Sequence, residues 1–268
     1  MPAVDHAICL VVSYDGGDFA GYARQPEQRT VQSELEAAIA TMNGEPTRAR
    51  SAGRTDAGVH ALAQRVAFDP LREIAPMGWV RGLNAELPDD MVVLDADVRA
   101  RGYDPRFDAV DKTYRYLLQL RAHRDPLMRK RAWWLGDSRQ KRDGGLELDA
   151  MRAAAASWIG THDFRAFRGP GDDRENTMRT ILSIEMREAW AGDASLVAIE
   201  VTGTAFMKNM VRILVGTLVE VGRGKMSSTE ATALLAPATL RAEAGPTAPA
   251  HGLTLVHVRL GRGSSVTA

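Results

Sequence analysis

The spacing of apolar residues changes several times along the first hundred residues. Residues 6–14 form an apolar run that predicts a buried strand, and residues 30–44 carry apolar side chains at helical spacing. Thr30 is a typical residue for the start of that helix, and Gly44 for its end. The other expected elements are strands at 47–51, 62–68 and 91–98 and a short helix after Pro76. This βαββαβ order is that of a split β-α-β, or ferredoxin-like, half.

The same order is expected, less clearly, in the rest of the chain. The expected elements are strands at 112–120, 178–187, 195–202 and 253–260 and helices at 149–159 and 206–221. The expected fold is therefore α+β, with two ferredoxin-like halves forming an extended mixed or antiparallel sheet that has its helices on one side. Pro105 stops regular structure, which predicts domains at 1–104 and 105–268.

Two segments outside these elements are rich in turn-forming and polar residues. Residues 139–145 and 236–249 are expected to form exposed loops. Asp172 and Asp173 follow a Gly-Pro-Gly sequence and are expected to be solvated.

Length and composition narrow the class of protein. The chain has 268 residues, enough for two domains that each bury a core. It contains no apolar run of about 18 residues and no charged-then-apolar leader, so we expect a soluble protein without a membrane span. Its one cysteine, Cys9, lies in an apolar run and is expected to be buried, which is consistent with a reducing cytoplasm.

The charge is unevenly distributed. The formal net charge is zero, which by itself argues against binding to a polyanion. Residues 99–142, however, hold 13 lysines and arginines against 5 aspartates and glutamates, interleaved with Tyr103, Phe107, Tyr114 and Tyr116. Such a basic strip suits phosphate contact and base stacking. A solvated face without a partner is an equally good explanation of the charge alone.

Residues 53–60, Gly-Arg-Thr-Asp-Ala-Gly-Val-His, place one carboxylate between two glycines. Gly53 and Gly58 permit left-handed backbone or close approach by a ligand, and Arg54 can hold a phosphate. This pattern makes Asp56 a candidate nucleophile. The alternative is a β-turn in which the aspartate is only a polar turn residue.

The run around Asp56 is one of several motifs that together resemble the TruA-type tRNA pseudouridine synthases. They occur in the family's order from about residue 8 to 260. The matching blocks include Tyr14-Asp15-Gly16, Leu83-Asn84, Arg106-Phe107, Lys112-Thr113-Tyr114-Arg115-Tyr116, His162-Asp163-Phe164, Met210-Val211-Arg212 and Gly252-Leu253.

The resemblance implies an isomerase that converts uridine to pseudouridine at positions 38–40 of the tRNA anticodon stem-loop. The reaction breaks and reforms a bond to the sugar without redox chemistry, so no cofactor and no metal are expected. The resemblance also implies base flipping, a central basic cleft, and a homodimer whose two subunits are spanned by tRNA.

The resemblance further assigns roles to five residues. Asp56 is the expected nucleophile, and Arg54 takes up the space left by the flipped base. Tyr114 stacks on the target uracil and is a candidate for handling its proton. Arg212 lies on an apolar helix and is expected to pair with the catalytic carboxylate, and Leu253 forms an apolar wall of the uracil pocket.

Structural alternatives exist for three of these residues. Arg54 is otherwise a surface arginine, and Leu253 a core leucine. Tyr114 is otherwise a packed strand aromatic, and Tyr116 faces the same side, so periodicity alone does not separate the two tyrosines.

Two other classes of function remain to be weighed. One is a non-catalytic tRNA-binding protein or RNA chaperone with the same fold, against which the intact set of Asp56, Arg54 and Tyr114 argues. The other is an aspartate-dependent hydrolase of a small phosphorylated substrate, against which the lack of a phosphate-binding loop argues. The chain departs from the family at Tyr22-Ala23 and Tyr103-Asp104-Pro105, where we expect altered tRNA contacts.

Overall fold

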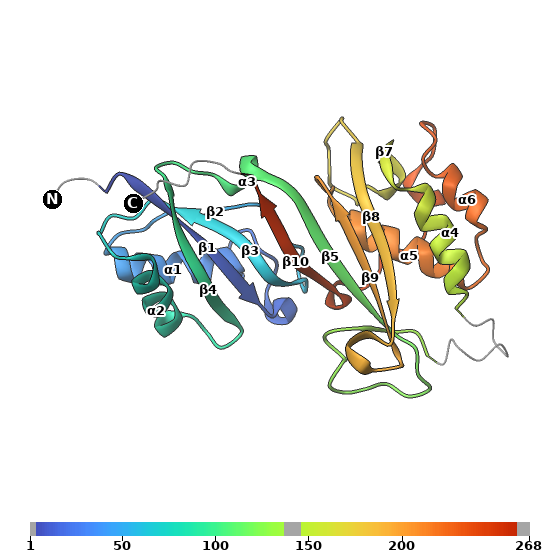
Figure 1. Ribbon diagram of the computed structural model, residues 1–268, viewed down its shortest axis with the longest axis horizontal. Coiled ribbons are helices and arrows are strands. Elements are labelled where there is room, and N and C mark those ends of the chain that lie inside the picture. Colours follow the sequence, from blue (N-terminus) through green and yellow to red (C-terminus); the bar gives the residue numbers. More distant parts are fainter. Residues whose placement is uncertain (1–3, 137–145, 262–268) are drawn as a thin grey trace. The chain divides into compact units, whose positions relative to one another are not determined.

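A computed structural model describes residues 4–136 and 146–261 (Figure 1). The described residues form ten strands and six α-helices, and the strands pair in both parallel and antiparallel fashion. The expected α+β class and mixed sheet are thereby confirmed. The expected loop at 139–145 lies outside the described residues.

Contacts divide the chain into two compact units. Unit 1 consists of Met1–Lys112 and Leu255–Ala268, and unit 2 of Thr113–Thr254. The expected domains 1–104 and 105–268 stay a prediction.

The strands of unit 1 follow the order β4-β1-β3-β10, and β2 also pairs with β3. In the centre of this arrangement Leu10 of β1 pairs antiparallel with Val66 of β3 and Ala96 of β4.

Cys9 is fully buried as expected, and burial raises the pKa of its thiol to about 12. The elements are β1 (His6–Tyr14), a 3₁₀ turn η1 (Gly16–Asp18), α1 (Val31–Asn43), β2 (Arg50–Ser51), β3 (His60–Phe68), α2 (Pro76–Glu86), β4 (Met91–Ala100), α3 (Pro105–Asp108) and β5 (Ala109–Gln119), which continues into unit 2.

Local sequence signals set the ends of the first helix. Thr30 Oγ1 accepts a hydrogen bond from the Ser33 N–H, and Ser33 Oγ accepts one from the Thr30 N–H, so a capping box starts α1. Gly44 ends it with φ of 84°, a backbone angle that favours glycine. Edge-on packing of Phe68 against Trp79, 4.9 Å between ring centres, joins β3 to α2.

Unit 2 places its strands in the order β5-β9-β8-β7, with β6 parallel to β5. The elements that begin after β5 are β6 (Trp133–Trp134), α4 (Leu148–Ser157), β7 (Gly160–Asp163), η3 (Arg165–Phe167), β8 (Met178–Glu188), η4 (Trp190–Gly192), β9 (Leu196–Gly203), α5 (Met210–Gly222), α6 (Ser228–Ala233), η5 (Arg241–Glu243), η6 (Ala250–Gly252) and β10 (Leu253–Leu260), most of which belongs to unit 1.

Helix α5 forms the centre of unit 2, because eleven of its thirteen residues are buried. The segment 236–249, expected to be exposed, is partly buried against it. Ala248 is fully buried, and the Gly245 N–H donates to Thr217 Oγ1 at 3.0 Å. A Cβ on Gly216 would lie 1.7 Å from the Pro246 oxygen, so glycine lets this segment approach the helix.

The expectation that Asp172 is solvated is wrong. Its side chain is only 4% exposed, and its carboxylate accepts hydrogen bonds from the Arg174 guanidinium and from the Lys208 N–H at 3.0 Å. The Arg174 hydrogen bond is the main reason why the pKa of Asp172 lies well below its usual range. The neighbouring Asp173 is exposed.

Asp172→Asn should lower the free energy of unfolding by about 1.5–3 kcal/mol at neutral pH, since hydrogen bonds to an ionised acceptor are lost. The folded-state pKa is depressed, so this stabilisation is complete above the unfolded value near 3.8 and is lost as the pH falls below it. Urea unfolding of wild type, Asp172→Asn and the control Asp173→Asn across pH measures this. A difference between wild type and Asp172→Asn that did not shrink in acid would contradict the assignment.

Candidate active site

Residues 52–59 connect β2 to β3 in unit 1, and we call them the aspartate loop. Asp56 lies in its middle and is partly exposed. Arg54 points to solvent, whereas the side chain of Thr55 is buried. Ala52, Thr55 and Val59 are buried, and the residues between them are partly or fully exposed.

Three hydrogen bonds hold the beginning of the loop. The Ala52 N–H donates to the Arg65 oxygen at 2.9 Å, and Gln64 Nε2 donates to the Gly53 oxygen at 2.9 Å. Lys112 Nζ donates to the Ala52 oxygen at 2.7 Å. Backbone groups of the loop that strands leave unpaired are thus satisfied by neighbours far apart in the sequence.

The residue before Asp56 is held by two tyrosines. The hydroxyls of Thr55 and Tyr14 share a buried hydrogen bond of 2.8 Å, and the Tyr22 N–H donates to the Thr55 oxygen at 3.0 Å. Burial raises the pKa of Tyr14 to about 12, so its phenol stays protonated at neutral pH. Gly21 has a φ of 113° and lies close to the aspartate loop, because a Cβ on this residue would be 3.1 Å from the Thr55 oxygen.

The end of the loop turns tightly. The Val59 N–H donates to the Asp56 oxygen at 3.1 Å, and the Gly58 N–H donates to the Phe19 oxygen at 3.3 Å. Gly58 has φ of 78°, which favours glycine at this turn. Gly16 lies directly against the loop, because a Cβ there would be only 2.0 Å from the Val59 oxygen.

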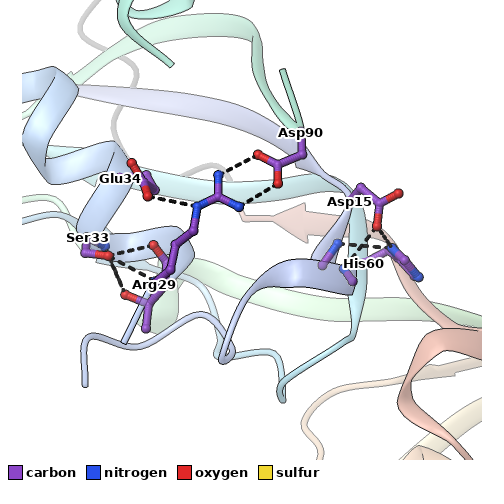
Figure 2. A network of polar contacts seen from close by, with 9 residues as sticks. Asp15, Arg29, Ser33, Glu34, His60 and Asp90 are labelled. Atoms are coloured by element: carbon purple, nitrogen blue, oxygen red, sulfur yellow. Dashed lines mark hydrogen bonds and ion pairs between the residues drawn. The ribbon is translucent and has the colours of Figure 1, made fainter. Parts of the chain in front are cut away.

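Figure 2 shows how His60, the first residue after the loop, meets the turn that follows β1. Its Nδ1 lies 3.0 Å from Asp15 Oδ1 and accepts a hydrogen bond from the Gly16 N–H at 3.1 Å. Asp15 Oδ1 also accepts from the Gly17 N–H at 3.0 Å. These contacts join the start of β3, directly after the aspartate loop, to this turn.

Arg29 braces the same region from the other side (Figure 2). Its guanidinium makes paired hydrogen bonds of 2.7 and 2.8 Å to Asp90 and one of 3.0 Å to Glu34. It also lies 4.1 Å above the Phe19 ring, and the Asp15 N–H donates to the Asp90 oxygen at 2.9 Å. The turn against which the aspartate loop rests is therefore itself fixed.

In unit 2 the structure separates the two tyrosines of the strand β5. Tyr116 is fully buried, and its hydroxyl donates to the Pro249 oxygen at 2.8 Å. Tyr114 is 8% exposed and packs edge-on against Phe206, with 5.3 Å between ring centres. Tyr116 thus has the contacts of a core residue.

Arg212 and Leu253 also lie in unit 2. Arg212 extends from α5 and donates to the Ala248 oxygen at 2.7 Å and to Asn209 Oδ1 at 2.9 Å. Leu253 is buried at the start of β10. Of the five expected site residues, Asp56 and Arg54 therefore share one loop of unit 1, and Tyr114, Arg212 and Leu253 belong to unit 2.

Several cations of the basic strip are paired within the protein. Arg115 contacts Glu200 at 2.7 Å and lies 4.1 Å above the Trp190 ring, and Arg121 contacts Asp125 at 3.3 Å. Arg139, Lys141 and Arg142 lie outside the described residues. The charge that this strip offers to a partner is thus smaller than its composition indicates.

A family model described as tRNA pseudouridine synthase matches residues 10–108 and 154–260. The chain belongs to the tRNA pseudouridine synthase family. As the sequence predicts, it is an isomerase of this class.

Curated relatives cover nearly the whole chain. The tRNA pseudouridine synthase A of Geobacter sulfurreducens is 42% identical over 253 residues, which cover 94% of this chain and 98% of the relative. That of Geotalea uraniireducens is 41% identical over 251 residues, with the same coverage. That of Bacillus subtilis is 41% identical over 249 residues, covering 92% of this chain and 96% of the relative.

Four residues that hold the aspartate loop were not expected from the sequence to do so: Tyr14, Tyr22, Gln64 and Lys112. Tyr14 and Lys112 lie inside motifs that match the family, which was the available signal. Gln64 follows the loop by a few residues. Tyr22 was expected to alter tRNA contact, but its side chain is only 2% exposed, so this departure from the family changes the core.

Proposed function

We propose that the chain converts uridine to pseudouridine in tRNA, with Asp56 as the nucleophile. The observation that carries this proposal is the aspartate loop, in which the family's motif surrounds a partly exposed carboxylate. Hydrogen bonds and glycine contacts on both sides of Asp56 fix its backbone. Such preorganisation is what a catalytic carboxylate needs.

The reaction explains the residue types. Breaking the glycosidic bond, turning the uracil and joining its carbon 5 to the sugar need an ionised carboxylate and a nucleotide extruded from its stack. Asp56 supplies the carboxylate, through attack on either the sugar or the ring. Arg54 is exposed beside it and is suited to fill the space left by the extruded base.

For the residues of unit 2 we propose the roles that the family implies. Tyr114 stacks on the target uracil, and the edge-on contact with Phe206 holds its ring in place. Leu253 provides an apolar wall to the uracil. The pairing of Arg212 with the catalytic carboxylate stays a prediction, beside its contacts with Ala248 and Asn209.

We further propose that both halves are ferredoxin-like, with domains at 1–104 and 105–268. In unit 1 the chain order β1-α1-β2-β3-α2-β4, with β1 between β3 and β4, supports this arrangement. The anticodon positions 38–40, a homodimer and a cytoplasmic location are proposals from the same resemblance. No helix in the described segments could cross a bilayer.

The rival from another class is a tRNA-binding protein or RNA chaperone without catalysis. Such a protein has no use for a carboxylate whose loop is held at its beginning, middle and end. The exposed Arg129 and Arg131 of the basic strip suit tRNA binding under either function.

Incubating the protein with unmodified tRNA in EDTA, without nucleotide or reductant, should produce pseudouridine at positions 38–40, because protein side chains supply every required group. Chemical mapping of pseudouridine reads this out. Bound tRNA that stays unmodified would favour the chaperone. Activity lost on chelation and restored by one divalent ion, at concentrations too low to affect tRNA folding, would contradict cofactor-free chemistry.

A further inference from the structure

Lys112 begins the block Lys112-Thr113-Tyr114-Arg115-Tyr116, yet its own side chain reaches back to the aspartate loop. Its Nζ lies 2.7 Å from the Ala52 oxygen, at the residue where the loop leaves β2. Ala52 is fully buried, and its N–H is held by Arg65. The ammonium group therefore contacts a backbone group that has little freedom to move.

This placement is unfavourable for the stability of the fold. Lys112 is half-buried, and burial, followed by the nearby charge of Arg106, lowers the pKa of its amine. Among the residues that the structure describes, it makes this single hydrogen bond, and no carboxylate forms an ion pair with it. An apolar side chain of similar length would avoid the desolvation of a charge. Stability alone does not explain a lysine here.

Gly53 is matched to this lysine. A Cβ at residue 53 would lie 3.0 Å from Lys112 Nζ, so glycine leaves room for the ammonium beside the loop. The Gly53 oxygen is in turn held by the fully buried Gln64. Lys112 and Gln64 thus fix two successive carbonyls, at residues 52 and 53, shortly before Asp56.

We propose that Lys112 is a positioning residue for the reaction, which fixes the start of the aspartate loop so that the Asp56 carboxylate is presented in its reactive orientation. This inference rests on the proposed role of Asp56. Lys112 acts through the backbone of Ala52, and a displacement of about 1 Å at a reacting group is enough to reduce a rate by roughly 100-fold. Its charge strengthens the hydrogen bond to the carbonyl.

The test compares Lys112→Met with wild type in single-turnover pseudouridine formation at saturating tRNA, in tRNA affinity across a salt series, and in thermal unfolding. Methionine keeps length and burial but removes the donor and the charge. We expect the rate to fall by about 10- to 100-fold. The dissociation constant and its salt slope should stay unchanged, and the melting temperature should change little, because relief from burying a charge offsets the lost hydrogen bond to the Ala52 oxygen. Lys112→Arg, which keeps a charged donor, should recover part of the rate.

Three results would overturn the inference. One is an unchanged rate. Another is weaker binding with a salt slope reduced by about 0.7–0.9 and a normal rate, which would make Lys112 a phosphate contact. The third is a lower melting temperature that accounts for the lost activity, which would make its role structural. If Lys112→Met does not fold, Lys112→Gln, which removes the charge and shortens the side chain, is compared with wild type and Lys112→Arg instead.

Two further variants separate this inference from the proposed function. Lys225→Met removes an exposed lysine that pairs with Glu220 in unit 2, and it should behave as wild type. Full activity in Asp56→Asn would overturn the role of Asp56 itself. An inactive Asp56→Asn together with a fully active Lys112→Met would overturn only the role of Lys112.

Discussion

Asp56→Asn should reduce pseudouridine formation by on the order of 10³-fold or more, while tRNA binding stays close to wild type. Asparagine keeps the shape of the side chain but cannot act as an ionised nucleophile. The loop should keep its conformation, because its anchors are contacts of Ala52, Gly53, Thr55 and Gly58. Single-turnover assays and filter binding on the same tRNA measure the two quantities.

Asp89→Asn is the matched control, since it removes an exposed carboxylate from the same unit. It should leave both rate and affinity unchanged. Binding lost in parallel with activity in a folded Asp56→Asn would make Asp56 an RNA-contact residue. Substantial remaining turnover would exclude it from the chemistry.

The sequence predicts long periodic elements well and short ones poorly. The strand expected at 6–14 has those bounds in the structure, because a central buried strand needs an unbroken apolar run. The strand expected at 47–51 shortens to β2, Arg50–Ser51. Here the Ala49 N–H donates to Glu36 Oε1 at 3.0 Å, a side-chain contact that replaces strand pairing and that no local pattern reveals.

The start of the long helix of unit 2 is likewise set by contacts that no local sequence pattern reveals. It is expected at 206–221 but begins at Met210. The backbone before it is used by a distant loop, since the Lys208 N–H donates to Asp172 and its oxygen accepts from the Gly169 N–H. Strands β6 and β7 are too short to produce a period and were not expected.

For the candidate site, too, the sequence predicts one part and misses another. Asp56 and Arg54 could be found because they lie in one contiguous motif. The residues that hold the loop come from β1, the turn after it, β3 and β5, and only the folded chain brings them together. Sequence thus pointed to the proposed nucleophile, and the structure adds the contacts that fix its loop.

Among those supports, Gly16 carries the largest expected effect outside Asp56. Gly16→Ala should lower activity by about 100-fold, because the added Cβ would lie 2.0 Å from the Val59 oxygen and 2.5 Å from its carbon. Both are backbone atoms of the aspartate loop, so the loop must shift. The backbone angle of Gly16 does not itself require glycine, so the effect comes from this contact.

Gly78→Ala on α2 is the matched control, since its Cβ would also meet a close neighbour, Ile74 Cγ2 at 2.7 Å, but this neighbour is a side chain outside the aspartate loop. This variant should keep full activity, because the overpacking against Ile74 affects the stability of the helix and not the position of the loop. Gly16→Ala should lose about 1–3 kcal/mol, as overpacked variants do. Single-turnover rates well below the melting temperature separate the two effects. A folded Gly16→Ala with wild-type turnover would show that the position of the loop against this turn does not govern the reaction.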